Sequence, residues 1–257
     1  GSDLSGTVTA QGLIDSIYAQ SGLRYAYIEV APTTANSTGG EPNGNIRNGF
    51  FYNVDRVSYV EGSAALITGS AYNNSRNPLV AQFEFAGQKV TAIDVHFTSR
   101  GGSDPLWGNN QPPADAGDAA RTAQAAGVKA YIQEHLADDP SFNVAVLGDW
   151  NGFYFEEAQT QLTDPAKGGV LTNLNTLLSP EERYSYLFGG NAQQIDNILV
   201  TGGLVTNAQY DSVHLNSQFG EDRATDHDPQ LALLMLGMAP RDLVLSQAAV
   251  DENLAAG

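Results

Sequence analysis

The chain has 257 residues, 42% of them hydrophobic, which suits one large α/β domain or two small ones with a substantial core. It contains no Cys, which excludes disulfides, zinc–thiolate sites, iron–sulfur clusters and Cys nucleophiles, and it has no run of about 18 apolar residues that would cross a membrane. The formal net charge of −17 repels nucleic acid and anionic membranes at long range, so a phosphate ligand would need a local basic group or a metal ion.

The first part of the chain predicts one helix followed by strands. Leu13, Ile14, Ile17 and Tyr18 share one face at helical spacing, which predicts a helix over residues 9–20. Alternating or β-rich segments then predict strands, which are separated by a polar loop over residues 32–45 and by short turns. The expected strands span residues 24–30, 46–52, 57–61, 80–85 and 89–97.

Helices and strands alternate in the rest of the chain. A long irregular segment over residues 100–116 precedes an expected helix over residues 117–137, and a loop of that length in a compact domain is usually functional. The apolar segments that follow predict a buried strand, two short helices and two more strands, over residues 142–147, 156–162, 171–178, 195–200 and 230–236. Strands interleaved with helices indicate a layered α/β fold.

Several motifs of nucleophile and cofactor enzymes are absent from the sequence. It contains no G-x-S-x-G, no H-E-x-x-H, no G-x-x-x-x-G-K-[ST] and no Gly-rich dinucleotide turn. This disfavours serine hydrolases, zincins, P-loop enzymes and nicotinamide enzymes. Polar residues instead stand at the ends of four apolar segments, where α/β enzymes collect their reacting groups. These residues are His96, Asp149 with Asn151, Asp196, and Asp226 with His227.

The first two of these segments also have a structural interpretation. A His at the end of a strand, such as His96, is more often a hydrogen-bonded structural residue than a catalyst. Asp149 and Asn151 are two positions apart, so an extended backbone would direct both side chains to one side. The same pair could equally stabilise a turn.

The last two segments carry a stronger indication of chemistry. Asp196 lies within an apolar strand, and a buried carboxylate needs a partner, which is often functional. Asp226 and His227 could form a simple turn, but Asp and His are also the residues that metal-assisted hydrolysis uses.

Taken together and in this order, the four segments resemble the endonuclease/exonuclease/phosphatase superfamily, the DNase I-like metal phosphoesterases. The resemblance extends from about Thr7 to Leu236. Residues 39–53 and 96–105 are similar to signature stretches of large secreted bacterial nucleases. The resemblance implies a four-layer α/β sandwich, in which two packed mixed sheets are flanked by helices, within one domain over residues 1–238.

The resemblance also implies roles for the residues of the candidate site. Asp149 would orient or deprotonate the attacking water, and Asn151 would hold the phosphate and that water. His227 would contact the phosphate and steady the charge of the transition state, with Asp196 orienting its ring. His96 would occupy a second position that faces the phosphate.

Metal and further phosphate contacts follow from the same resemblance. Asp226, together with Asp149, would be a metal-site carboxylate, and the cation would be Mg²⁺, or else Mn²⁺ or Ca²⁺. Arg47 and Arg100 are candidates for phosphate contacts, although an Arg exposed on the surface without such a role is the commoner explanation.

One departure from the family pattern concerns the start of the chain. The superfamily opens with a strand that ends in Asn and a strand that ends in Gln-Glu, whose Glu is the principal metal ligand. Neither motif precedes the helix expected over residues 9–20, and Glu29 on the next strand is a poor substitute. We therefore expect the chain to lack the first strands of the fold, with the main Glu ligand upstream of Gly1. Such a fragment should bind metal weakly, turn over slowly and expose an unpaired sheet edge.

The C-terminal segment over residues 239–257 has a different character. Residues 243–246 are similar to the opening strand of a cadherin-like repeat, and a disordered acidic terminus is an equal alternative. We interpret this segment as a linker or as the start of such a repeat, which would make further domains of a longer parent chain its neighbours.

Three functions remain open from the sequence. The leading one is a divalent-metal-dependent phosphodiester hydrolase, an extracellular or cell-surface bacterial nuclease that acts on DNA or RNA and whose signal peptide is not in this chain. The nearest alternative is a phosphoesterase for lipid or inositol headgroups on the same fold. A different class is a non-catalytic calcium-binding or adhesion module. The sequence does not predict an oligomeric state.

Overall fold

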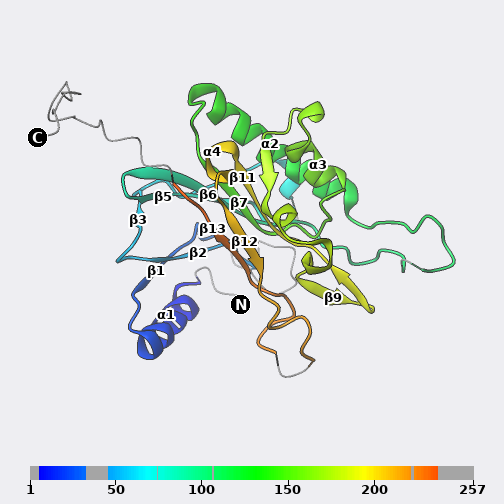
Figure 1. Cartoon of the computed structure of the whole chain (residues 1–257), viewed down its shortest axis with the longest axis horizontal. Helices are drawn as coiled ribbons and strands as arrows, with labels where there is room; N and C mark the ends of the chain where they lie inside the picture. The colour runs from blue at the N-terminus through cyan, green and yellow to red at the C-terminus, as the bar shows by residue number, and fades with distance from the viewer. Residues whose placement is uncertain (1–5, 33–45, 74, 106, 221–222, 237–257) are drawn as a thin grey trace, which may run out of the picture.

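A seven-stranded sheet forms the centre of the computed structural model, which describes residues 6–32, 46–73, 75–105, 107–220 and 223–236 (Figure 1). Its strands are β3 (Ser58–Tyr59), β4 (Ala65–Leu66), β5 (Leu79–Phe85), β6 (Gln88–His96), β7 (Val144–Asp149), β8 (Leu171–Asn173) and β11 (Asp196–Thr201). They run in the order β3-β5-β6-β7-β11-β8, and β4 also pairs with β5. Only β6 and β7 are parallel among these pairs of described strands.

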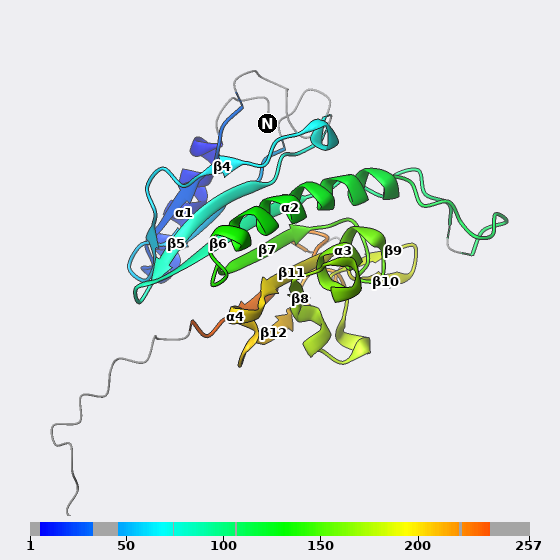
Figure 2. The ribbon, with the colours of Figure 1, turned by 90° about the horizontal axis from the view of Figure 1, so that it is seen from above.

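Two helices cover one face of this sheet, which we call the helix-covered face (Figure 2). Successive side chains of a strand point to opposite faces, so Ile93 and Val95 of β6 lie together on this one. They pack with Val128 and Ile132 of the long helix, and all four side chains are at most 1% exposed. The helices are α2 (Asp118–Asp138) and α3 (Glu157–Thr163).

Two separate hairpins cover the other face, which we call the hairpin-covered face. Phe50 of the first hairpin packs with Leu79 and Ala81, and Tyr210 of the second packs in another cluster with Val200. Within the described residues each hairpin is a two-stranded sheet of its own. A helix lies against the first hairpin and completes the layers. These elements are α1 (Thr7–Ser21), β1 (Tyr25–Ile28), β2 (Phe50–Asn53), β12 (Gln209–Ser212) and β13 (Gln230–Leu233).

Short elements connect these layers. The strands β9 (Tyr186–Phe188) and β10 (Asn191–Gln193) form a third hairpin, and α4 (Gly202–Val205) follows β11. The 3-10 helices are η1 (Ser70–Tyr72), η2 (Pro165–Lys167), η3 (Leu174–Leu177) and η4 (Pro180–Glu182). None of the helices in the described ranges is both long and apolar enough to cross a membrane.

The architecture confirms the predicted layered α/β sandwich and corrects one element. The helix expected over residues 171–178 is wrong, because this segment begins as β8 and turns into η3. The side chain of Asn173 accepts a hydrogen bond from the backbone N–H of Asn175, which caps the short helix after an extended residue. The predicted polar loop lies outside the described residues from position 33 on, as does the whole segment 239–257.

Candidate active site

The register of three neighbouring strands brings three of the predicted residues into one row. His96 of β6 lies opposite Asp149 of β7, and Asp149 lies opposite Asp196 of β11. Alternation places all three side chains on the hairpin-covered face, at the ends of their strands. His227 joins them because its backbone forms a β-bridge with Tyr186 of β9.

His227 and Asp196 form a hydrogen-bonded pair. The Nδ1 of His227 lies 2.7 Å from the Oδ2 of Asp196, and the hydroxyl of Ser185 donates to the same oxygen at 2.6 Å. Burial of the ring works against protonation, but this hydrogen bond and the charges of Asp196, Asp149 and Asp226 outweigh it and raise the pKa of His227 to about 9. The ring is therefore an imidazolium at neutral pH, with N–H groups on both of its nitrogens.

The surroundings of Asp149 favour its neutral form, whereas those of His227 favour its charged form. Its carboxylate accepts hydrogen bonds from the backbone N–H of Asn151 at 2.7 Å and from the side-chain amide of Asn151 at 3.0 Å. Burial and the neighbouring charge of Asp196 nevertheless raise the pKa of Asp149 to about 7. The Nε2 of His96 lies 3.4 Å from the Oδ2 of Asp149. Burial, together with the charges of Arg76 and His227, lowers the pKa of His96 to about 4, so that its ring is neutral.

The turn that follows β7 fixes the position of Asn151. This residue has a left-handed backbone with φ of 48°, and its side-chain amide also donates to the carbonyl of Phe97 at 3.1 Å. Gly148 has φ of 130°, and a Cβ there would overlap the carbonyl oxygen of Val95 on the parallel strand. A side chain other than hydrogen is thus excluded at position 148.

A group of charged side chains supports the same turn from outside. Glu156 accepts a hydrogen bond from the backbone N–H of Phe153 at 3.2 Å and pairs with Arg100 at 2.7 Å. Arg100 also pairs with Asp115 at 3.1 Å and lies over the ring of Phe153 at 4.4 Å. Arg100, predicted as a phosphate contact, is therefore a structural neighbour of the Asn151 turn.

The structure places Arg47 apart from the row, and Asp226 beside one end of it. Arg47 pairs with Glu29 at 3.1 Å, and both side chains are largely buried. Glu29 also accepts hydrogen bonds from the backbone N–H of Gly6. Asp226 is exposed beside His227, on which its charge acts.

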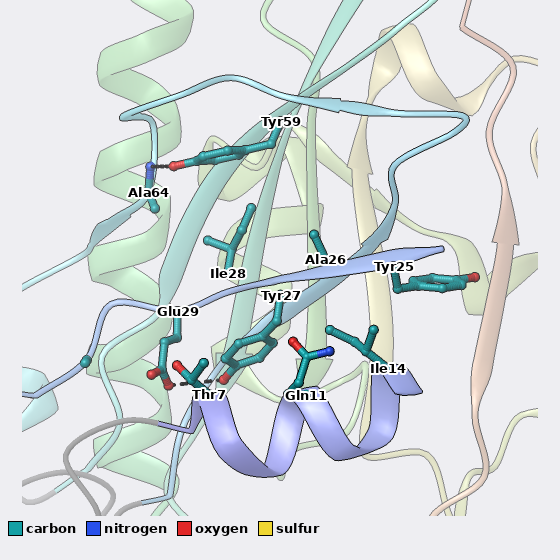
Figure 3. A pocket seen from close by; sticks show the side chains of 11 residues that line it. Thr7, Gln11, Ile14, Tyr25, Ala26, Tyr27, Ile28, Glu29, Tyr59 and Ala64 are labelled. Carbon is teal, nitrogen blue, oxygen red and sulfur yellow. Dashed lines mark hydrogen bonds between the residues drawn. The ribbon is translucent and has the colours of Figure 1, made fainter. Parts of the chain in front are cut away.

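An open hollow of about 570 Å³ lies elsewhere, between α1 and β1 (Figure 3). Its walls include Gln11, Ile14 and Tyr27, and no member of the row lines it. Within α1 only Ala10 is buried, whereas Leu13 of the predicted apolar face is 49% exposed. The hollow therefore reflects the incomplete packing of α1.

Asp149, Asp196 and His227 form a group that could hold a metal ion, since their ligand atoms lie within 4.8 Å of one another. The carboxylate oxygens suit a hard divalent cation, which would relieve the repulsion between the two half-buried carboxylates. His227 fits less well as a ligand, because a ligating ring must be neutral. A second carboxylate group, Asp115, Asp118 and Glu156, already faces Arg100.

Two residues beside the row were not predicted. Arg76 is 8% exposed, and its Nε donates to the carbonyl of His96 at 3.1 Å. Asp94 accepts from the backbone N–H of Gly49 at 3.0 Å, and burial raises its pKa to about 7. Asp94 precedes His96 by two positions, so strand alternation would have placed it on the same face, whereas Arg76 lies in a polar loop without a periodic signal.

The fold that carries this site is shared with solved structures. No protein-family model matches the sequence, and no curated protein matches it. Truncated TDP2 of Caenorhabditis elegans is similar with a TM-score of 0.60 and 13% identity, over 87% of this chain and 79% of that one. The endonuclease/exonuclease/phosphatase of Bacteroides vulgatus gives a TM-score of 0.55 and 16% identity, over 88% and 81%. The human Nocturnin catalytic domain, solved with bound sulfate, gives 0.53 and 16%, over 88% and 74%.

Proposed function

Since the chain has the DNase I-like fold of endonuclease/exonuclease/phosphatase proteins, we propose that its site is that of a divalent-metal-dependent phosphodiester hydrolase, an extracellular nuclease that acts on DNA or RNA. The observation that carries the proposal is the convergence of four side chains from distant parts of the sequence. His96, Asp149, Asp196 and His227 meet at the ends of adjacent strands. Phosphoryl transfer needs positioned charge of both signs, and this site supplies both.

The raised pKa values of Asp149 and His227 suit these two residues to different roles in the reaction. A carboxylate with a raised pKa is a good proton acceptor near neutral pH, so Asp149 takes a proton from the attacking water. Asn151 is held rigidly beside Asp149 because its amide donates to Asp149 and to the carbonyl of Phe97, and its side-chain oxygen accepts a hydrogen bond from the attacking water. As the new bond from water to phosphorus forms, the bond from phosphorus to the leaving oxygen breaks.

His227 acts through its charge. Because its pKa is raised to about 9, it keeps its proton at neutral pH and donates to a phosphate oxygen, on which negative charge grows in the transition state. Asp196 and Ser185 fix the orientation of its ring. Asp149 and Asp196 would hold a divalent cation, which would supply the additional positive charge that a phosphodiester requires in so acidic a protein.

Plasmid nicking in the presence of Mg²⁺, Mn²⁺ or Ca²⁺ tests this function. Asp149→Ala and His227→Ala should each abolish cleavage, whereas His135→Ala at the far end of α2 should leave it intact. Nicking at the wild-type rate by both site variants would refute the mechanism.

A lipid or inositol phosphate remains a second candidate substrate on the same site. The observation that favours it is the exposure of Trp107, at 86%, and of Phe155, at 64%, since aromatic residues anchor proteins at membrane interfaces. Release of phosphorylated headgroups from vesicles, with no cleavage of any oligonucleotide, would establish this substrate in place of nucleic acid.

A further inference from the structure

Aromatic rings lead outward from the candidate site along β9. The ring of Tyr186 lies 4.8 Å from that of His227, and the ring of Phe188 lies 6.2 Å from that of Tyr186 and is tilted from it by 11°. We call His227, Tyr186 and Phe188 the aromatic ladder. Tyr186 and Phe188 are two positions apart on one strand, so they point to the same side of the hairpin.

The ladder begins in the site and ends in solvent. Tyr186 is half-buried, and its ring contacts that of His227, which is hydrogen-bonded to Asp196. Phe188 is 63% exposed, on a hairpin that projects from the edge of the body in Figure 1. An exposed aromatic ring that stabilises no core is available to a ligand.

Electrostatics limits what that ligand can be. The net charge of −17 opposes binding through phosphates alone. Of the twelve Lys and Arg residues, four pair with carboxylates and are less available to phosphates: Arg24, Arg47, Arg100 and Arg121. Near the ladder, the charge of Arg223 acts on Tyr186. Affinity for a nucleic acid must therefore come in large part from uncharged contacts.

Stacking on aromatic rings is such a contact, and it is open only to bases whose faces are not covered by a complementary strand. We propose that the aromatic ladder binds an unpaired nucleobase next to the scissile phosphate, so that the substrate is single-stranded nucleic acid. The inference rests on the proposed function, because it takes His227 as the residue that holds the phosphate. A base adjacent to that phosphate then lies over Tyr186 and Phe188.

Binding of short oligonucleotides tests the ladder separately from catalysis. The probe is a fluorescein-labelled thymidine 12-mer, and its binding is followed by fluorescence anisotropy in the Asp149→Asn background, which blocks cleavage. Phe188→Leu keeps an apolar side chain but removes the ring, and we expect it to weaken binding about tenfold. Phe188→Trp should restore it. A 12-mer with abasic central nucleotides should bind weakly and equally to all variants.

The matched control is Phe85→Leu. Phe85 is 43% exposed and lies at the opposite end of the β5–β6 hairpin, about 26 Å from the row at ~3.3 Å per strand residue. This variant should bind the 12-mer like its parent. The proposal is overturned if Phe188→Leu binds as tightly as its parent, if the abasic 12-mer binds as well as the normal one, or if a hairpin duplex binds best. It is also overturned if Phe188→Leu loses only binding to phosphatidylglycerol vesicles.

The two hypotheses fail in different ways. If wild-type protein and Phe188→Leu cleave the 12-mer equally well, the proposed function stands and the role of the aromatic ladder is refuted. Protein that binds the 12-mer through Phe188 but cleaves no oligonucleotide with any divalent cation retains the ladder and loses the proposed function.

Discussion

The two faces of the central sheet differ in what they leave accessible to solvent. On the helix-covered face Ile93 and Leu199 have no exposed surface. On the hairpin-covered face Leu79 and Val200 are equally buried, but the two hairpins are separate sheets, and Leu231 on the outer side of β13 is 60% exposed. The ionisable side chains of the candidate site lie on this second face and are only partly buried. Both faces thus stabilise the fold, and the hairpin-covered face also carries charged groups that a ligand can reach.

We expect the largest effect on stability at the end of β7, where the strand leads into the Asn151 turn. Gly148→Ala would force a Cβ into the carbonyl of Val95, so we expect severe loss of folded protein, by about 4 kcal/mol or more. Gly87→Ala is the matched control, because it also has positive φ but meets no atom, and it should cost only about 1–2 kcal/mol. Urea unfolding measures both. Equal losses would show that backbone strain alone matters at Gly148.

Truncation of one Leu in the central sheet and one on the outer side of the hairpin layer should give the next largest difference in stability. Leu199→Ala removes a fully buried side chain from the helix-covered face and should cost about 2–5 kcal/mol in the free energy of unfolding. Leu231→Ala on the outer side of β13 should change it by no more than about 0.5 kcal/mol. A large cost at Leu231 would mean that a further contact covers β13 in solution.

The charged support of the Asn151 turn should matter for both folding and catalysis. Glu156→Gln weakens the pairing with Arg100 and should cost about 1–3 kcal/mol of stability. We expect kcat to fall about tenfold with little change in KM, because the turn positions the groups that react. Glu157→Gln, next in the chain, alters an exposed pair with Lys167 and a long hydrogen bond from Thr160, and it should leave both quantities near wild type. A change in KM alone would assign Glu156 to substrate binding.

The pH dependence of stability should show the smallest effect. The folded protein raises the pKa of His227 from 6.5 to about 9, so this group stabilises the fold fully below pH 6.5. That contribution is lost as pH rises from 6.5 to about 9. The free energy of unfolding should therefore fall through this window in the wild type, and less steeply in His227→Gln. Identical slopes in the two proteins would contradict the imidazolium assignment.

The row of catalytic candidates was predictable because it depends on local signals. Each of His96, Asp149 and Asp196 ends or begins an apolar strand, and strand alternation sets its face. The division of the second layer into two separate two-stranded sheets was not predictable from periodicity. Two hairpins have the same sequence pattern whether or not their strands pair with each other.

The aromatic ladder was also missed, although its hairpin carries a signal. Gly189 and Gly190 both adopt positive φ, and a Gly-Gly pair between short β-rich segments is typical of a two-residue hairpin turn. What the sequence does not contain is the long-range contact that brings Tyr186 against His227, 41 positions later, because that contact depends on packing between elements rather than on local pattern.

The central claim is that Asp149, Asp196 and His227 converge on one cation and one phosphate, and a Mn²⁺ titration tests it most directly. Wild-type protein should bind Mn²⁺, more weakly than micromolar because few oxygen ligands are present among the described residues. Asp149→Asn should abolish this binding, and Asp118→Asn in the other carboxylate group should leave it unchanged. Loss of Mn²⁺ binding in Asp118→Asn with full binding in Asp149→Asn would contradict the account.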